Sequence, residues 1–284
     1  MNSDVRIVAR DRRDRLGEGS LWSVRDQALY WVDILDFRVN RMASDGAVST
    51  WQLDDYVGWV IERESGGLVA GVGQSFVRLS LDPLEATPIA PPQPMLDGHR
   101  VNDAKADAQG RIWAGIMPVR CDAPTGGFYR LDPDGTAICV DRPYTIPNGP
   151  AISPDNRWLL HTDTEIGTIF RFDINDDGSL GQRVPFIDFQ ADWGSPDGMT
   201  FDAEGGLWVA CWGGGCVRRF TPEGHLDRVI ALPASQITSC TFAGPELDRM
   251  FVTSASVDVD EPEGGALFEI DPGVCGLAAG RYRG

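Results

Sequence analysis

Four side chains with oxygen donors recur at matching positions along the chain. Each stands ten or eleven residues before an apolar segment that has the character of a strand. Carboxylate and carboxamide oxygens, without histidine or cysteine, are ligands for hard or borderline divalent cations. Two negative charges and two amides brought together away from water are costly unless a cation neutralises them. The four residues are Glu18, Asn102, Asn148 and Asp197.

Taken singly, each of these residues has a simpler explanation. Glu18 fits a solvated loop charge, Asn102 fits a residue that caps its own backbone, and Asn148 and Asp197 fit ordinary Asn-Gly and Asp-Gly turns. Their joint recurrence is what favours a site for one divalent ion. We expect calcium, magnesium or manganese, with zinc or iron(II) also compatible. Three or four protein oxygens leave coordination positions open, which suits catalysis.

The elements that would position these side chains follow from a repeat. The stretch 195–215 reads as a turn, a short strand (Met199–Phe201), an Asp/Gly turn (Asp202–Gly206) and a second strand (Leu207–Cys211). Six copies occur, spaced by 39 to 48 residues, a period typical of propeller blades with four strands each. The apolar anchors of the second strands are Leu29, Leu68, Ile112, Leu159, Leu207 and Met250.

The predicted fold is therefore all-β, a six-bladed β-propeller that uses residues 1–284 as a single domain. We expect Val5–Val8 to pair with the last copy and close the ring, because an open sheet edge needs cover. Innermost strands line the channel, and their heads reach the mouth where ligands usually bind. In the two blades that lack a donor, the equivalent places are Gly58 and the neighbourhood of Cys240.

The amino-acid composition limits which partners the chain is expected to bind. The chain has 25 basic and 42 acidic residues, a net charge of -17, which would repel nucleic acid and anionic membranes. No stretch approaches the roughly 20 apolar residues of a membrane helix, and the start lacks a secretory core, so we expect a cytoplasmic protein. Six cysteines without a CxxC pair indicate reduced, buried thiols. The oligomeric state stays open, and a monomer is compatible.

Four motifs carry a family resemblance. They are GEGSLW at 17–22, RVNDAKADAQGRIWAGIM at 100–117, PNGPAISPD at 147–155 and SPDGMTFDAEGGLWVA at 195–210. In this order, and over essentially the whole chain, they resemble the regucalcin and gluconolactonase family, also called the senescence-marker and luciferin-regenerating-enzyme family. The resemblance implies a six-bladed propeller with one divalent metal in the channel and a sugar lactone as substrate. It implies Glu18, Asn148 and Asp197 as metal ligands, with Asn102 and Arg100 contacting the substrate.

One departure from the family leaves the substrate open. Some relatives carry acidic residues on a loop that touches the substrate, whereas here Met117 is followed by Pro118, Val119 and Arg120. The family resemblance therefore does not predict which sugar lactone is used or its ring size. It also does not predict whether Arg120 and His99 contribute to specificity.

The expected mechanism is hydrolysis of a sugar (aldono) lactone to the sugar acid. The metal would polarise the carbonyl, and either Asp197 as general base or a metal-bound hydroxide would activate water. Arg100 and Asn102, two residues apart on one strand, would hold sugar hydroxyls or the carbonyl. Two alternatives remain: a non-enzymatic calcium-binding propeller, or a hydrolase of another ester or lactone.

Other motifs are set aside. The segment DINDDG at 173–178 matches the first half of a calcium loop, but Val184 stands where a bidentate Glu is required, so a hairpin turn is the better interpretation. No G-x-S-x-G elbow accompanies the three histidines, which disfavours a serine hydrolase. His161 lies in an apolar strand and is interpreted as a hydrogen-bonded core residue.

Overall fold

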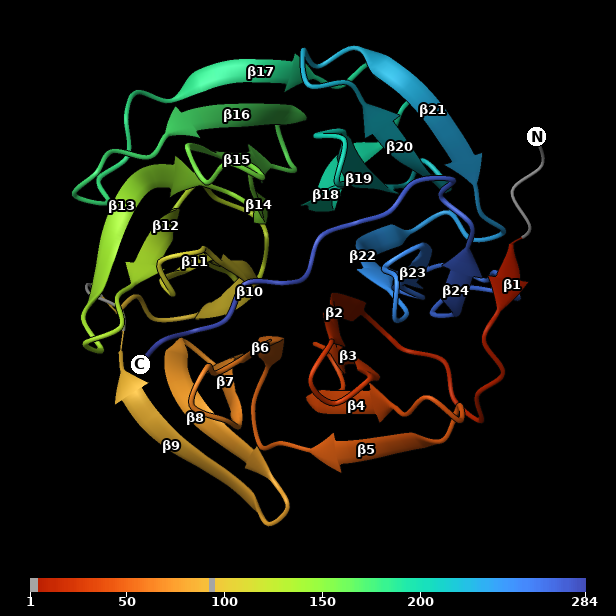
Figure 1. Cartoon of the computed structure of the whole chain (residues 1–284), viewed down its shortest axis with the longest axis horizontal. Coiled ribbons are helices and arrows are strands. Elements are labelled where there is room, and N and C mark those ends of the chain that lie inside the picture. Colours follow the sequence, from red (N-terminus) through yellow and green to blue (C-terminus); the bar gives the residue numbers. More distant parts are fainter. Residues whose placement is uncertain (1–4, 92–94) are drawn as a thin grey trace.

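The computed structural model describes residues 5–91 and 95–284, and the regular elements of these residues are β-strands. They form six four-stranded antiparallel sheets. Figure 1 shows the sheets as blades around a ring, which confirms the predicted all-β, six-bladed propeller. Within the described residues, no helix is long and apolar enough to cross a membrane.

The blades are numbered in chain order, and each of the first five begins with its innermost strand. Blade one has β2 (Gly17–Ser23), β3 (Ala28–Asp33), β4 (Arg38–Met42) and β5 (Val48–Gln52). Blade two has β6 (Val57–Glu62), β7 (Leu68–Val72), β8 (Ser75–Leu81) and β9 (Leu84–Ala90). Blade three has β10 (His99–Ala106), β11 (Ile112–Pro118), β12 (Gly126–Leu131) and β13 (Ala137–Tyr144).

The remaining blades follow the same plan. Blade four has β14 (Pro147–Ile152), β15 (Trp158–Asp163), β16 (Thr168–Asp173) and β17 (Val184–Asp188). Blade five has β18 (Ser195–Phe201), β19 (Leu207–Trp212), β20 (Cys216–Phe220) and β21 (Leu226–Ala231). Blade six has β22 (Ile237–Ala243), β23 (Arg249–Ser254) and β24 (Leu267–Ile270), with β1 (Arg6–Ile7) as its outer strand.

Both ends of the chain contribute to blade six. Strand β1 pairs antiparallel with β24, with Ile7 opposite Phe268, and the amide of Val8 donates to Leu267 O at 2.8 Å. The predicted closure by residues 5–8 is therefore confirmed. The N-terminal strand covers an edge that the last three strands would otherwise leave open.

All six apolar anchors lie in second strands and are at least nine-tenths buried. One boundary was predicted wrongly: the innermost strand of blade five begins at Ser195, not at Met199. Asp197 therefore belongs to a strand and not to a turn ahead of it. The loop after Asp173 is a turn, as predicted, with Gly178 donating its amide to Asn175 O at 2.8 Å.

Every innermost strand carries one extra residue relative to its neighbour. In β10, for example, Val101 opposes Ile116 and Ala104 opposes Ala114, so two residues face the single Gly115. Such a bulge bends the strand and redirects its side chains. The six register shifts fall between Glu18 and Leu21, Val57 and Trp59, Val101 and Ala104, Asn148 and Ala151, Pro196 and Met199, and Ile237 and Ser239.

The bulges also explain the two blades without a donor. A Cβ on Gly58 would lie 2.4 Å from Asn102 O, so blade two has no room for a side chain at this level. In blade six the bulged residue is Thr238, and Cys240 lies further along β22. The predicted equivalent position in blade six, near Cys240, therefore lies two residues away from the bulged residue.

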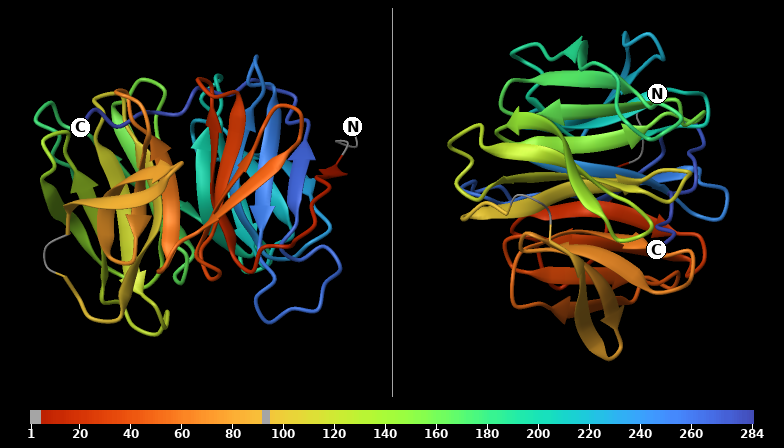
Figure 2. Two further views of the ribbon diagram at one scale, coloured as in Figure 1. Left: turned by 90° about the horizontal axis from the view of Figure 1, so that it is seen from below. Right: turned by 90° about the vertical axis from the view of Figure 1, so that its left-hand side faces the viewer.

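The C-terminal tail, residues 271–284, crosses the ring at the face where the innermost strands end (Figures 1 and 2). The amide of Gly276 donates to Leu247 O in blade six, and the amide of Tyr282 donates to Glu62 O in blade two. The amide of Arg283 donates to Gly110 O after β10. The tail therefore connects opposite sides of the ring.

Two expectations about single residues are corrected. His161 is fully buried, but neither ring nitrogen has a hydrogen-bond partner among the described residues. Its ring packs against Phe128, with centroids 3.7 Å apart, and burial lowers its pKa well below the usual value. All six cysteines are free, but Cys121 and Cys275 are exposed, so the thiols are not uniformly buried.

Candidate functional site

The four predicted oxygen donors come from four blades and are all buried, with exposed fractions of 3 to 6%. Glu18 lies on β2, Asn102 on β10, Asn148 on β14 and Asp197 on β18, each next to or within the bulge of its strand. The side chains of Asn102 and Asn148 touch directly, with 2.9 Å between Nδ2 and Oδ1. The bulges thus bring donors far apart in sequence to one level of the channel.

A chain of hydrogen bonds orders the amide side of this cluster. Arg100 Nη1 donates to Asn102 Oδ1 at 2.7 Å, and Asn102 Nδ2 donates to Asn148 Oδ1. Asn148 Nδ2 then donates to Thr164 Oγ1 at 3.0 Å, and the Thr164 hydroxyl donates to Pro196 O at 2.8 Å. Because a guanidinium can only donate, the direction of the whole chain is set from Arg100. The side-chain amide of Asn148 is therefore oriented with its Oδ1 toward the Nδ2 of Asn102.

Three buried carboxylates make up the acidic side. Burial raises the pKa of Glu18 well above its usual value, and the charges of Asp197 and Asp103 raise it further. Burial also raises the pKa of Asp197 well above normal, with the charge of Asp103 next and a hydrogen bond with Glu18 acting in the opposite direction. Asp103 thus raises the pKa of both Glu18 and Asp197, and all three carboxylates are buried.

Asp103 was missed by the sequence reasoning. Its exposed fraction is 1%, and burial raises its pKa while the charge of Lys105 lowers it. In a regular strand, adjacent residues point to opposite faces, so Asn102 and Asp103 would not both serve one site. The bulge places both opposite Gly115. Thr164, in the loop after β15, was also missed, because it lies outside the innermost strand.

The cluster is short of positive charge and of hydrogen-bond donors. Asp197 Oδ1 and Asp103 Oδ2 are buried without a hydrogen-bond partner among the described residues. Within residues 5–91 and 95–284, no three His, Cys, Asp or Glu side chains are arranged to hold a metal ion by themselves. Glu18, Asn148 and Asp197 offer an all-oxygen set of that kind, which fits a hard divalent cation.

Arg100 is the buried cation beside the cluster, with an exposed fraction of 5%. Burial lowers its pKa, whereas the charges of Cys121, Glu18, Tyr56 and Asp197 raise it. Its two hydrogen bonds, to Val101 O and Asn102 Oδ1, both come from Nη1. The guanidinium is therefore held next to the carboxylates.

The two residues whose roles were left open lie outside this cluster. His99, at the start of β10, has Nε2 2.9 Å from Thr125 Oγ1 and Nδ1 3.0 Å from Asp97 O. Arg120 is exposed in the turn after β11. Neither residue makes a hydrogen bond with a residue of the cluster within the described part of the chain.

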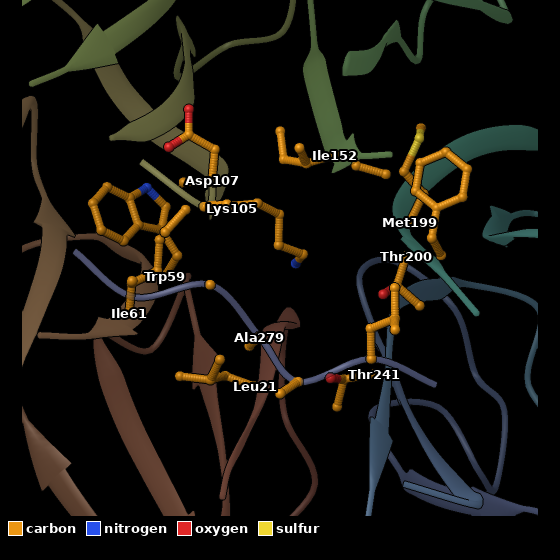
Figure 3. A pocket seen from close by; sticks show the side chains of 18 of the residues that line it. Leu21, Trp59, Ile61, Lys105, Asp107, Ile152, Met199, Thr200, Thr241 and Ala279 are labelled. Atoms are coloured by element: carbon orange, nitrogen blue, oxygen red, sulfur yellow. The ribbon is translucent and has the colours of Figure 1, made fainter. Parts of the chain in front are cut away.

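Behind the cluster lies a cavity of about 210 Å³. Gly19 and Ala104, which line it, directly follow Glu18 and Asp103 in the sequence. Leu21, Ile61, Met199 and tail residues 277–280 also line it, and Figure 3 shows Lys105 extending into the space. The cavity therefore separates the site from the C-terminal tail.

Comparison with known proteins identifies a family. The family model described as SMP-30/Gluconolactonase/LRE-like region matches residues 16–256. The chain is 33% identical to the 6-deoxy-6-sulfogluconolactonase of Pseudomonas putida, with 100% of both chains covered. It is 34% identical to the pentonolactonase of Haloferax volcanii, covering 96% of this chain and 95% of the relative. A solved calcium-binding protein, regucalcin, from Agrobacterium tumefaciens superimposes with a TM-score of 0.94 at 25% identity, covering 100% and 98%.

Proposed function

Because the chain belongs to the SMP-30/gluconolactonase/LRE-like family, we propose that it hydrolyses a sugar lactone to the sugar acid with the help of one divalent metal ion. The observation that carries the proposal is the buried cluster of Glu18, Asn148 and Asp197 with Asp197 Oδ1 unpaired. Buried carboxylates without enough cationic partners destabilise a fold unless a cation joins them.

The metal would be held by Glu18, Asn148 and Asp197. Such an ion, when bound, supplies Lewis-acid chemistry: it polarises a carbonyl oxygen and makes nearby water more acidic. Asn148 suits this role because Asn102 and Thr164 fix its amide, so that its oxygen is presented without rotation. The donor set alone does not choose between calcium, magnesium, manganese, zinc and iron(II).

Asp197 is the proposed general base. Its free Oδ1 accepts a proton from the attacking water, while the water oxygen bonds to the lactone carbonyl carbon. The bond from that carbon to the ring oxygen then breaks, and the proton passes to the ring oxygen as it becomes a hydroxyl.

Arg100 is the proposed substrate contact, because its Nε and Nη2 make no hydrogen bond with the described residues while Nη1 is used twice. Asn102 has fewer free hydrogen-bonding groups for a substrate. Both of its amide protons are used, on Pro147 O and on Asn148 Oδ1, and its oxygen already accepts from Arg100. We therefore assign Asn102 chiefly to holding Asn148 and Arg100 in place.

The test is acid release from a panel of lactones, including gluconolactone, pentonolactones and 6-deoxy-6-sulfogluconolactone, with chelator and with each metal added back. Asp197→Asn should lower the rate by about 100-fold or more, the usual scale for loss of a general base. Asp173→Asn, an exposed carboxylate on β16, is the matched control and should keep full activity. Activity that survives both chelation and Asp197→Asn would overturn the proposal.

A non-enzymatic calcium-binding role is the second candidate, since the solved regucalcin is described as a calcium-binding protein. The same experiment separates the two. Calcium binding without hydrolysis of any lactone would favour the second candidate, and hydrolysis of other esters alone would point to a different substrate class.

A further inference from the structure

Lys105 is the only lysine in the chain; the other 24 of its 25 basic residues are arginines. It lies on β10, two residues after Asp103, and its Nζ is 3.9 Å from Asp103 Oδ1. An ammonium group is a compact, strongly hydrated point charge, unlike the planar guanidinium. A chain that uses arginine everywhere else therefore places its single ammonium beside the acidic cluster.

The surroundings of Lys105 make its charge effective. The side chain is 22% exposed and extends into the cavity behind the cluster (Figure 3). The cavity walls include the apolar side chains of Leu21, Ile61 and Met199, and Ala279 of the tail also lines it. Among the described residues, Asp103 is the carboxylate that pairs with Lys105. A charge in such surroundings is screened less than one on the surface.

The formal charges of the site explain what this ammonium contributes. With every group ionised, as metal ligands must be, Glu18, Asp103 and Asp197 would supply three negative charges, and Arg100 and Lys105 would supply two positive ones. A bound divalent ion would leave the site with one net positive charge. Attack by water develops one negative charge on the carbonyl oxygen, while the proton that the water gives up neutralises Asp197, so the loaded site keeps one net positive charge beside the oxyanion. When the acid product loses its proton to solvent, the same positive charge faces a carboxylate.

We propose that Lys105 is a positioning residue whose fixed charge, acting through Asp103 from behind the site, weakens metal binding and in return keeps the loaded site positive for the anionic transition state and acid product. The inference rests on the proposed metal-dependent lactonase function. It assigns opposite signs to two effects of one substitution: without the ammonium, the metal binds more tightly and catalysis is slower. A merely structural lysine would weaken both when removed.

The first test is calorimetric titration of metal-stripped protein at pH 8.5, where protons compete least with metal for the carboxylates. Ca²⁺, Mn²⁺ and Zn²⁺ are titrated in turn, and the tightest is used for the variants. Lys105→Met should lower the metal Kd at least about fivefold. Lys105→Arg, which keeps the charge, and Arg171→Met, which removes one charge from an exposed position on β16, should stay within about twofold of wild type.

The second test uses the single lysine as a spectroscopic probe. Protein labelled with ¹³C and ¹⁵N only in lysine gives one side-chain NMR signal, which needs no assignment. Saturation with the metal should shift that signal in wild type, because the charge beside Asp103 changes. In steady-state assays, Lys105→Met should lower kcat about tenfold with little change in KM. The acid product should inhibit this variant less strongly than it inhibits the wild type.

The outcomes separate this inference from the proposed function. A metal Kd that is unchanged or weaker in Lys105→Met, or a lysine signal that does not move on metal binding, would overturn the role of Lys105 and leave the lactonase proposal standing. If wild type binds none of these three metals, and neither Mg²⁺ nor Fe²⁺ under anaerobic conditions, both proposals are wrong.

Discussion

Asp197 is subject to opposing influences. Burial and the charge of Asp103 raise its pKa, whereas hydrogen bonds with Glu18 and the Gly198 amide, and the charge of Arg100, lower it. A general base works best when its pKa is near the working pH. Glu18 has no such second task in the proposed mechanism, because its Oε2 accepts from the Gly19 amide at 2.8 Å and its role is to hold the ion.

The two carboxylates can therefore be told apart by metal rescue. Glu18→Gln should weaken metal binding and lower activity, and excess metal should restore much of the rate, because the base is intact. Asp197→Asn should lose activity about 100-fold or more without rescue, because the proton acceptor is gone. The measurement is the initial rate of acid release as a function of metal concentration. Equal rescue of both variants would contradict the separate roles.

Asp14 gives a pH-dependent prediction away from the site. It accepts from Arg10 Nη1 at 2.8 Å and from Trp31 Nε1 at 3.0 Å, yet burial outweighs these contacts and raises its pKa from 3.8 to about 6. Because the folded-state pKa is the higher one, the stabilising contribution is complete below about pH 4 and is lost as pH rises through 6.

Between pH 4.5 and 7.5, wild type should therefore lose roughly 2 kcal/mol of unfolding free energy relative to Asp14→Asn. Urea unfolding of both proteins at the two pH values measures this difference, and the other titrating groups cancel in the comparison. If the two proteins show the same change with pH, the assignment to Asp14 is wrong.

At the scale of elements, the innermost strands and the tail determine how the site is built. Each innermost strand has one extra residue next to its donor: Asn102 and Asp197 lie within the bulge, and Glu18 and Asn148 directly before it. The tail lies behind them and is anchored by Tyr282. This side chain is 1% exposed, and its hydroxyl donates to Asp132 O at 2.9 Å.

Tyr282→Ala should lower the free energy of unfolding by about 3 to 5 kcal/mol, the range for deleting a large buried aromatic ring. Tyr282→Phe, which loses only the hydrogen bond to Asp132, should cost about 1 kcal/mol. Denaturant unfolding of both variants provides the comparison. A Tyr282→Ala variant as stable as wild type would show that the tail does not hold the ring together.

Much of this architecture could be predicted from the sequence, because it depends on local patterns. The second-strand anchors, such as Leu29 and Leu207, recur with their turns and identify the six blades. The place of Asp103 in the cluster could not be predicted, because strands are predicted from side chains that alternate between two faces and a bulge interrupts that alternation. Thr164 and the path of the tail depend on contacts between distant segments, which leave no periodic signal.

At the scale of the whole molecule, the proposed metal ligands belong to blades one, four and five, so only the folded ring presents them together. A ligand that binds only the folded state stabilises it by about 2.7 kcal/mol at 100 times its Kd. For a chain of 284 residues this corresponds to a rise in Tm of about 4 to 5 °C. Differential scanning calorimetry should show the rise in wild type and not in Asp197→Ala. An equal rise in both would place the stabilising ion elsewhere.

The net charge of -17 also bears on the proposed reaction. A neutral sugar lactone approaches an acidic protein without penalty, whereas the acid product is repelled from its surface. The long-range field thus favours product release, while Arg100 and Lys105 supply the local positive charge.

In the proposed function, side chains of separate blades hold one cation at the channel, where the lactone is hydrolysed. Anomalous diffraction from crystals soaked in Mn²⁺ tests its position most directly. We expect a single strong peak within bonding distance of Glu18, Asn148 and Asp197. A peak elsewhere, or none at these residues in a protein that is active with Mn²⁺, would contradict it.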